Sequence, residues 1–243
     1  MVDPYELLFG GMEKLGPGSD ADTLQVLRSL PPRSLQTIVD AGCGTGRQTL
    51  VLAGELRQVV HAVDTHVAFL RQLTERAEQA GLAALVQTHA LDMAELGNHF
   101  KAIDLLWAEG SAYSIGFERA LHAWRPTLAD AGLLVVSELC WLNAAPPAAA
   151  RDFFAAEYPE MKSTDQVGAI CERVGLTQLG THSLPTQAWR EGFYDELQPR
   201  AEALVNHADA ATRELAQDML KEIEIFSQHN NSYGYVFFVL ERR

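Results

Sequence analysis

The feature that most constrains this chain is a glycine loop between a short apolar strand and a helix. Residues Asp40–Gly46 have the sequence DAGCGTG, after an expected strand at Thr37–Val39 and before an expected helix at Gln48–Leu56. Glycine permits a tight turn and a close approach of a ligand to the backbone. Free N–H groups at the start of a helix favour anionic and polar ligands. The loop therefore predicts a ligand site in an α/β protein.

Strands and helices continue to alternate after this loop. Further elements are expected at Val59–Val63, His66–Ala80, Leu85–His89, Ile103–Trp107, Phe117–Leu128 and Gly132–Leu139. Such alternation is typical of parallel strands in a doubly wound sheet, and right-handed crossovers place helices on both faces. We therefore predict an α/β fold with a doubly wound, mostly parallel sheet.

The rest of the chain is expected to add helices and two strands to the same unit. Residues 1–35 predict helix, loop and helix, with the first apolar periodicity running from Leu7 to Leu15. After the break AAPPAAA we expect helices at Thr164–Val174 and within Pro199–Ser227, and strands at Leu176–Ser183 and Tyr233–Leu240. We predict one domain over 1–243, with N-terminal cap helices (1–35), a cofactor-binding core (36–143) and C-terminal helices with the last two strands (144–243).

Charge and cysteine content narrow the classes of partner. The net charge is −13, which disfavours nucleic-acid backbones and anionic membrane surfaces because both attract clustered Lys and Arg. Three widely spaced cysteines without a CxxC pair disfavour a disulfide framework and a zinc site. No apolar stretch is long enough to span a membrane. We expect a cytoplasmic protein that binds no metal and acts on a small molecule.

Acidic residues recur where successive strands are expected to end. Asp64, followed by Thr65, lies 18 residues after Gly46, and its carboxylate suits the two hydroxyls of a ribose. The next strand ends near Asp92-Met93, where a carboxylate accepts from an adenine amino group and a thioether packs on the ring. The following strand ends at Glu109-Gly110. Open α/β sheets bind ligands at these carboxyl ends.

The glycine spacing distinguishes between two kinds of cofactor. Dinucleotide folds use GxGxxG around a pyrophosphate, whereas this loop has GxGxG after an acid, Asp40. A carboxylate repels a pyrophosphate but suits a cationic amino acid moiety. The combination favours S-adenosylmethionine, which carries an ammonium and a sulfonium.

The sequence VDAGCGTGRQT resembles motif I of the class I S-adenosylmethionine-dependent methyltransferases, and the resemblance extends over residues 36–140. It implies a Rossmann-like, seven-stranded sheet whose last strand, Tyr233–Leu240, is antiparallel. In that family the glycine loop contacts the methionine part of the cofactor, and the ends of strands two and three hold the ribose and the adenine. Carried over, and with neighbouring candidates added, the predicted cofactor-binding residues are Gly18, Ser19, Asp40, Gly42, Gly44, Gly46, Gln48, Asp64, Thr65, Asp92, Met93, Glu109 and Gly110.

Two further segments narrow the resemblance. WAEGSAYSIGFERAL (107–121) and the upstream GPGS (16–19) resemble a bacterial group of small-molecule methyltransferases of the ubiquinone-biosynthesis type. Glu109-Gly110-Ser111-Ala112 stands where amino-methylating members carry an NPPY-type tetrapeptide. This departure disfavours the amino groups of DNA, glutamine or adenine as acceptors.

Methyl transfer needs an acceptor aligned in line with an activated carbon, and a base only where the acceptor must lose a proton. Candidate catalytic residues are Glu109 and Tyr113, although Glu109 also suits the cofactor ammonium or backbone N–H groups. Candidate acceptor-pocket residues are Tyr5, Phe9, Tyr113, Glu138 and Trp141, each of which is also compatible with plain packing or a solvated position.

The sequence predicts a methyltransferase that produces S-adenosylhomocysteine and a methylated small molecule by in-line displacement. Two alternatives stay open at this point. One is a protein that binds the cofactor without catalysis, because fold alone does not determine function. The other is a dinucleotide-dependent oxidoreductase, which the GxGxG spacing disfavours.

Overall fold

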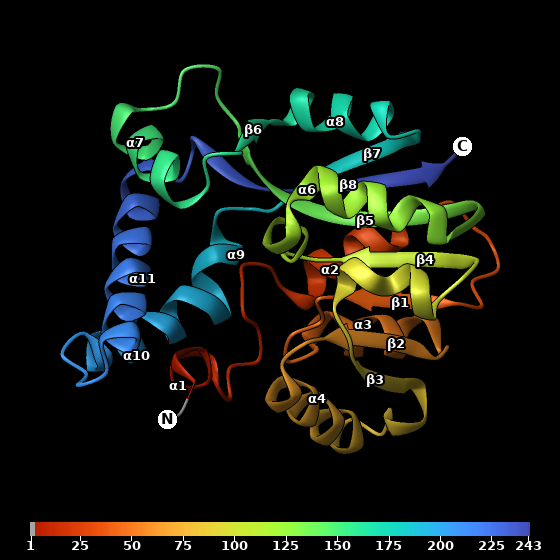
Figure 1. The fold of residues 1–243 in the computed structure, drawn as a ribbon, viewed down its shortest axis with the longest axis horizontal. Coiled ribbons are helices and arrows are strands. Elements are labelled where there is room, and N and C mark those ends of the chain that lie inside the picture. The colour runs from red at the N-terminus through yellow and green to blue at the C-terminus, as the bar shows by residue number, and fades with distance from the viewer. Residues whose placement is uncertain (1–2) are drawn as a thin grey trace.

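A computed structural model describes residues 3–243 (Figure 1). Its strands are β1 (Ile38–Ala41), β2 (Val60–Asp64), β3 (Val86–Ala90), β4 (Ile103–Ala108), β5 (Leu128–Trp141), β6 (Lys162–Ser163), β7 (Leu176–Ser183) and β8 (Tyr233–Arg242). Its helices are α1 (Pro4–Phe9), α2 (Asp20–Arg28), α3 (Arg47–Leu56), α4 (Val67–Gln79), α5 (Leu96–His99), α6 (Phe117–Trp124), α7 (Ala148–Glu157), α8 (Thr164–Arg173), α9 (Gln187–Trp189), α10 (Asp195–Leu204) and α11 (Ala210–His229).

The strands form one mixed sheet in the order β3-β2-β1-β4-β5-β8-β7. β1 to β5 pair in parallel, whereas β8 is antiparallel to both β5 and β7. The predicted doubly wound α/β fold with an antiparallel last strand is thus confirmed. Within residues 3–243 the sheet has eight strands, one more than predicted, because the short β6 adds a two-residue pairing beside the end of β5.

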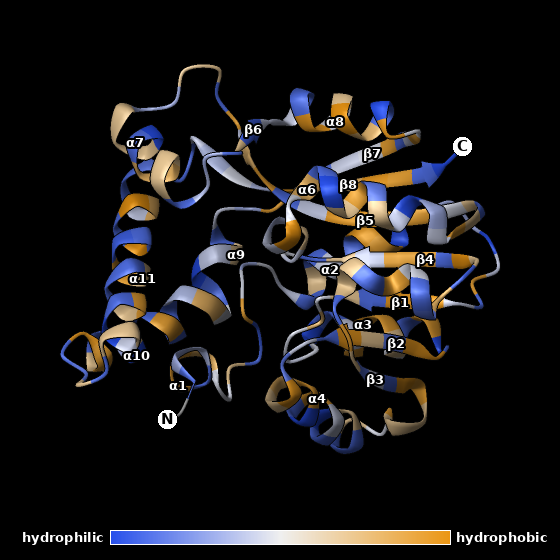
Figure 2. Cartoon of the chain, viewed as in Figure 1, coloured by the Kyte–Doolittle hydropathy of each residue, from blue (hydrophilic) through white to orange (hydrophobic). Residues whose placement is uncertain are grey.

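Side chains from alternate positions of each strand cover opposite faces of the sheet, as the two-residue period of a strand requires. On β4, Leu106 and Ala108 join a core with α6 and α8, while Leu105 and Trp107 join a second core with α2 and α3. Figure 2 shows apolar residues concentrated along the central strands β1, β4 and β5. Helices therefore cover both faces, as predicted.

A third core lies outside the sheet. Helices α1, α7, α9, α10 and α11, which we call the helical cap, pack around a cluster that includes Phe154, Trp189, Tyr194 and Phe226. Of the predicted N-terminal cap helices only α1 belongs to it, because α2 packs on the sheet. In Figure 1 the cap stands opposite the carboxyl ends of the parallel strands. The cap therefore faces the edge of the sheet at which open α/β folds bind ligands.

Three local expectations differ from the structure. The first helix ends at Phe9 rather than continuing toward Leu15, because Gly10 and Gly11 follow it and Gly11 has a φ of 78°. The AAPPAAA segment was expected to break the chain, yet α7 begins directly after Pro147, a position where the missing N–H of proline costs nothing. Strand β5 begins at Leu128, before the expected Gly132.

Among residues 3–243, no helix combines the length and the apolar character needed to cross a bilayer.

Candidate functional site

The glycine loop joins β1 to α3 through three residues in the left-handed region. Gly42, Gly44 and Gly46 have φ values of 72°, 54° and 82°, which side chains other than glycine rarely adopt. A Cβ on Gly42 would lie 2.4 Å from the Cβ of Ser111, at the end of β4. The loop therefore needs glycine both for its turn and for its close contact with the neighbouring strand end.

Asp64 ties this loop to the end of β2. Its Oδ2 accepts a hydrogen bond from the Gly44 N–H at 2.8 Å, and its Oδ1 accepts one from the His66 N–H at 2.8 Å. The carboxylate and the adjacent Thr65 line the cavity described below. The predicted proximity of the glycine loop and Asp64 is thus present in the structure.

The end of β3 brings Asp92 and Met93 to the same edge. Asp92 caps the short 3₁₀ helix at Met93–Glu95 by accepting from the Ala94 N–H at 2.8 Å. Met93 is buried, and its sulfur would lie 3.3 Å from a Cβ placed on Gly42. Both residues line the cavity, so three successive strand ends contribute to it as predicted.

Glu109, at the end of β4, is held by three donors. It forms a buried ion pair with Lys14, and it accepts hydrogen bonds from Thr23 Oγ1 and Trp107 Nε1, each at 3.1 Å. Two of these donors come from the N-terminal segment and α2. Because its oxygens are already bonded, the structure favours the cofactor-binding or structural interpretation of Glu109 over proton transfer.

Lys14 is a cavity residue that the sequence interpretation missed. It lies in the segment between the end of α1 and the start of α2, which carries no motif, and its side chain is only 7% exposed. A Cβ on Gly18 would lie 2.5 Å from its Nζ, and the Gly18 N–H donates to Ala188 of the cap at 2.9 Å. No spacing rule marks such a lysine, since only the folded chain brings it to Glu109.

Asp40 does not line the cavity, in contrast to its predicted contact with the cofactor. It is fully buried beneath the glycine loop, where its Oδ2 accepts from Thr49 Oγ1 at 2.5 Å. Burial raises the pKa of Asp40 from 3.8 to about 7. Gln48, which does line the cavity, donates to the Cys43 carbonyl at 3.2 Å. Asp40 therefore supports the loop from below.

Several other predicted residues also lie outside the cavity lining. Ser19 caps α2 in a reciprocal pair with Asp22, and Gly46 shapes the turn into α3. Glu138 is buried and accepts from Tyr158 Oη at 2.6 Å, and burial raises its pKa to about 7. Trp141 packs edge-on against Phe154. These positions favour structural roles, and a direct role in binding stays a prediction.

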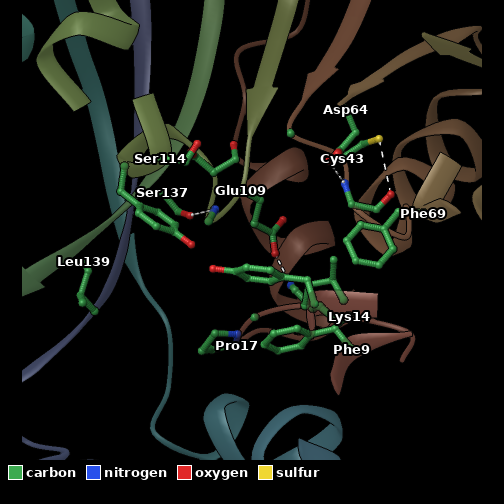
Figure 3. A pocket seen from close by; sticks show the side chains of 18 of the residues that line it. Phe9, Lys14, Pro17, Cys43, Asp64, Phe69, Glu109, Ser114, Ser137 and Leu139 are labelled. Carbon is green, nitrogen blue, oxygen red and sulfur yellow. Dashed lines mark hydrogen bonds and ion pairs between the residues drawn. The ribbon is translucent and has the colours of Figure 1, made fainter. Parts of the chain in front are cut away.

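A cavity of about 740 Å³ lies between the strand ends and the helical cap. Figure 3 shows the side chains of Phe9, Lys14, Asp64, Phe69 and Glu109 around it. The predicted residues that line it are Tyr5, Phe9, Gly42, Gly44, Gln48, Asp64, Thr65, Asp92, Met93, Glu109, Gly110 and Tyr113. Its volume falls in the range of small-molecule sites.

The far wall of the cavity comes from the helical cap and was not predicted. It consists mainly of aromatic rings together with two carboxylates, Glu157 on α7 and Glu222 on α11. Within residues 3–243, no three His, Cys, Asp or Glu side chains form a group that could hold a metal ion. The cavity thus has a polar end at the sheet and an aromatic, acidic end at the cap.

Comparison with known proteins agrees with this architecture. Residues 38–132 match a family model described as a methyltransferase domain. A protein of Bacillus subtilis (strain 168) described as the uncharacterized methyltransferase YodH is 28% identical over 138 residues, which are 57% of this chain. The matched region spans 58% of the length of that relative.

Solved structures share the fold over nearly the whole chain. A structure of a SAM-dependent methyltransferase from Thiobacillus denitrificans, in complex with S-adenosyl-L-homocysteine, superposes with a TM-score of 0.83 at 16% identity and covers 100% of this chain and 99% of its own. The [4+2]-cyclase SpnF has a TM-score of 0.76 at 17% identity, covering 98% and 93%. Together with the family match, these confirm the resemblance to class I methyltransferases.

The buried Asp40 carboxyl gives a pH-dependent test of this geometry. Its raised pKa means that the folded state binds the proton more tightly than the unfolded state does, so the stabilisation present below about pH 4 is lost as the pH rises to about 7. The Asp40→Asn side chain cannot ionise. We therefore expect the unfolding free energy of this variant to increase relative to that of the parent protein between about pH 4 and about pH 7, and the difference to stay constant at higher pH.

Urea titrations at a series of pH values measure this difference. Asp130→Asn, on an exposed side chain at the other edge of the sheet, serves as the matched control. A difference between Asp40→Asn and the parent that stays constant with pH would contradict the buried, proton-retaining carboxyl.

The Lys14–Glu109 ion pair gives a second test. Lys14→Met leaves a buried carboxylate without its cation, which we expect to cost about 3–5 kcal/mol of unfolding free energy. Adding Glu109→Gln removes the stranded charge, so the double variant should be destabilised by less than the sum of the two single variants. Denaturant unfolding of all four proteins measures the coupling.

The exposed pair Arg28–Glu55 provides the control for this cycle, since both of its side chains are more than a third exposed. Surface pairs of this kind contribute little, so Arg28→Met should change stability far less than Lys14→Met. Strict additivity of the Lys14 and Glu109 substitutions would show that the two side chains do not stabilise one another.

Proposed function

We propose that this chain, a class I methyltransferase by its domain match and its fold, transfers a methyl group from S-adenosylmethionine to a small-molecule acceptor. The observation that carries the proposal is the hydrogen-bonded unit of glycine loop and Asp64 at the sheet end of a cavity large enough for two ligands. The subgroup of ubiquinone-biosynthesis type stays a prediction.

The residues at the sheet end fit the cofactor. Asp64 offers carboxylate oxygens to ribose hydroxyls, while Asp92 and Met93 suit the adenine, as the resemblance implies. The methionine end carries one ammonium and one carboxylate, and it would meet Glu109 and Lys14, which offer the complementary charges. Because Gly42 leaves no room for a side chain beside Ser111, the loop backbone is free to contact the ligand.

S-adenosylmethionine, when bound, supplies an electrophilic methyl carbon attached to a positive sulfur. The task of the protein is then to align the acceptor lone pair with that carbon, because alignment supplies much of the rate in such displacements. Tyr113, half-exposed at the cavity, is placed to contact the acceptor. The helical cap limits access of water from the other side.

The glycine-loop spacing and the methyltransferase-domain match both favour this function over a dinucleotide-dependent oxidoreductase. The second candidate function is binding of the cofactor without methyl transfer. The cyclase SpnF shares the fold, so the fold by itself does not require methyl transfer.

Binding of S-adenosylhomocysteine tests the cofactor site directly. We expect measurable heat by titration calorimetry with the parent protein. Asp64→Ala should weaken binding by about 1–3 kcal/mol, because a charged hydrogen-bond acceptor is lost. Asp64→Asn, which keeps an oxygen acceptor for the Gly44 N–H, separates loss of the charge from collapse of the loop.

Asp130→Ala is the control for this titration, since Asp130 lies at the opposite end of β5. Undetectable heat with the parent protein would overturn the cofactor assignment. An unchanged affinity of both Asp64 variants would remove Asp64 from the site.

Turnover distinguishes the enzyme from the non-catalytic alternative. We expect S-adenosylhomocysteine to accumulate when the protein is incubated with S-adenosylmethionine and a panel of amines, phenols, thiols and quinones, because the cavity holds an acceptor beside the cofactor. Liquid chromatography with mass detection of both products measures this. A protein that binds the cofactor tightly but consumes none with any acceptor would support the binding function instead.

A further inference from the structure

The cap end of the cavity is an aromatic enclosure. Six rings line it: Phe153 and Phe154 on α7, Tyr158 directly after α7, Trp189 at the end of α9, Phe193 between α9 and α10, and Tyr235 on β8. Several pack directly on one another, including Trp189 stacked on Tyr235 at a centroid distance of 5.4 Å. Such mutual packing fixes the rings in place, so the wall is preformed for a ligand.

Glu222 projects from α11 into this enclosure. The side chain is partly buried and lines the cavity, and its Oε1 accepts a hydrogen bond from Tyr194 Oη at 2.6 Å. No ion pair within residues 3–243 includes Glu222. Burial raises its pKa, and the nearby Glu157 raises it further by repulsion. A carboxylate in such surroundings is costly unless a positive partner approaches it.

Glu157 adds a second negative charge to the same end. It follows Phe153 and Phe154 on α7 and also lines the cavity. Glu157 and Glu222 thus bring two carboxylates to the lining of one cavity.

Positive side chains do not neutralise this end. The one lysine or arginine that lines the cavity among the described residues is Lys14, and it is engaged with Glu109. Lys221 lies over the Phe153 ring at 5.4 Å from its centroid, but it is exposed and does not line the cavity. The charge at the cap end is therefore negative.

From this combination we infer that the acceptor is a basic amine carried on an apolar or aromatic body, which binds as its ammonium to Glu222 and Glu157. The ammonium gives one proton to a carboxylate there, and the freed nitrogen lone pair then forms the N–C bond as the C–S bond breaks with its electron pair staying on sulfur. Aromatic faces attract cations through their negative π faces, and the two carboxylates add direct attraction. An anionic acceptor meets repulsion from both carboxylates. The inference rests on the proposed function, because it assigns the acceptor of the same cavity.

Three matched probes test the charge requirement. Phenethylamine, 2-phenylethanol and 3-phenylpropionate share a ring and a short chain but are cationic, neutral and anionic. We expect phenethylamine to bind at least about tenfold more tightly than 2-phenylethanol, and 3-phenylpropionate to bind most weakly, because of the attraction described above. Titration calorimetry on the full chain, with and without S-adenosylhomocysteine, measures the three affinities.

Glu222→Gln is the decisive variant. Its amide oxygen still accepts from Tyr194 Oη, so the fold is retained while the charge is removed. We expect it to lower phenethylamine affinity about tenfold and to leave the affinities for 2-phenylethanol and S-adenosylhomocysteine unchanged. Glu224→Gln, an exposed position on the same helix, is the matched control and should change none of them.

The outcomes separate this inference from the proposed function. Absence of phenethylamine binding, equal binding of the amine and the alcohol, or an unchanged preference in Glu222→Gln would overturn the amine assignment, even where S-adenosylhomocysteine binds well. Absence of S-adenosylhomocysteine binding would instead overturn the cofactor proposal. Because the amine titrations need no turnover, they give a result in either case.

Discussion

The ion pair between Lys14 and Glu109 joins the parts of this molecule that the sequence keeps apart. It fastens the segment between α1 and α2 to the end of β4, in a place where both side chains are almost fully buried. Trp107 and Thr23 complete the shell of donors around the carboxylate. Burying an ion pair costs desolvation free energy, which is offset only when further hydrogen bonds satisfy the remaining lone pairs. The donors around Glu109 therefore stabilise this attachment.

The segment that carries Lys14 also contacts the helical cap. The Gly18 N–H bonds to Ala188, which connects the same segment to the helical cap. Within the cap, Arg200 on α10 donates to the carbonyls of Leu8 and Gly10, which anchors the end of α1 to α10. The N-terminal segment therefore bridges the sheet and the cap, and the volume between them remains open as a cavity.

The sequence allowed the sheet end of the site to be predicted, for a simple geometric reason. Parallel strands bring their carboxyl ends to one edge, so the glycine loop, Asp64, Asp92 and Glu109 follow from strand order alone. Asp40 also lies at a strand end, but its side chain points beneath the loop, and period and spacing do not specify that direction. Glu138 illustrates the same ambiguity on β5, where its neighbours Ser137 and Leu139 line the cavity and it does not.

The cap end could not be predicted in this way. Glu222 and Trp189 lie on helices in the C-terminal part of the chain, and their proximity to Tyr158 depends on how α7, α9 and α11 pack. An amphipathic pattern identifies the buried stripe of α11 but does not distinguish a residue facing a cavity from one at the edge of the core. Lys14 was missed because its partner is ninety-five positions away along the chain.

The charges that line the cavity also fit the chemistry as a whole. Five carboxylates and a single lysine line it among the described residues. Two cationic ligands placed side by side would repel each other across a space of low polarity, where charges interact more strongly than in water. The carboxylates offset that repulsion at both ends. Once the acceptor ammonium has given up one proton to a carboxylate, methyl transfer would move the positive charge from sulfur to the acceptor nitrogen, within reach of the same negative side chains.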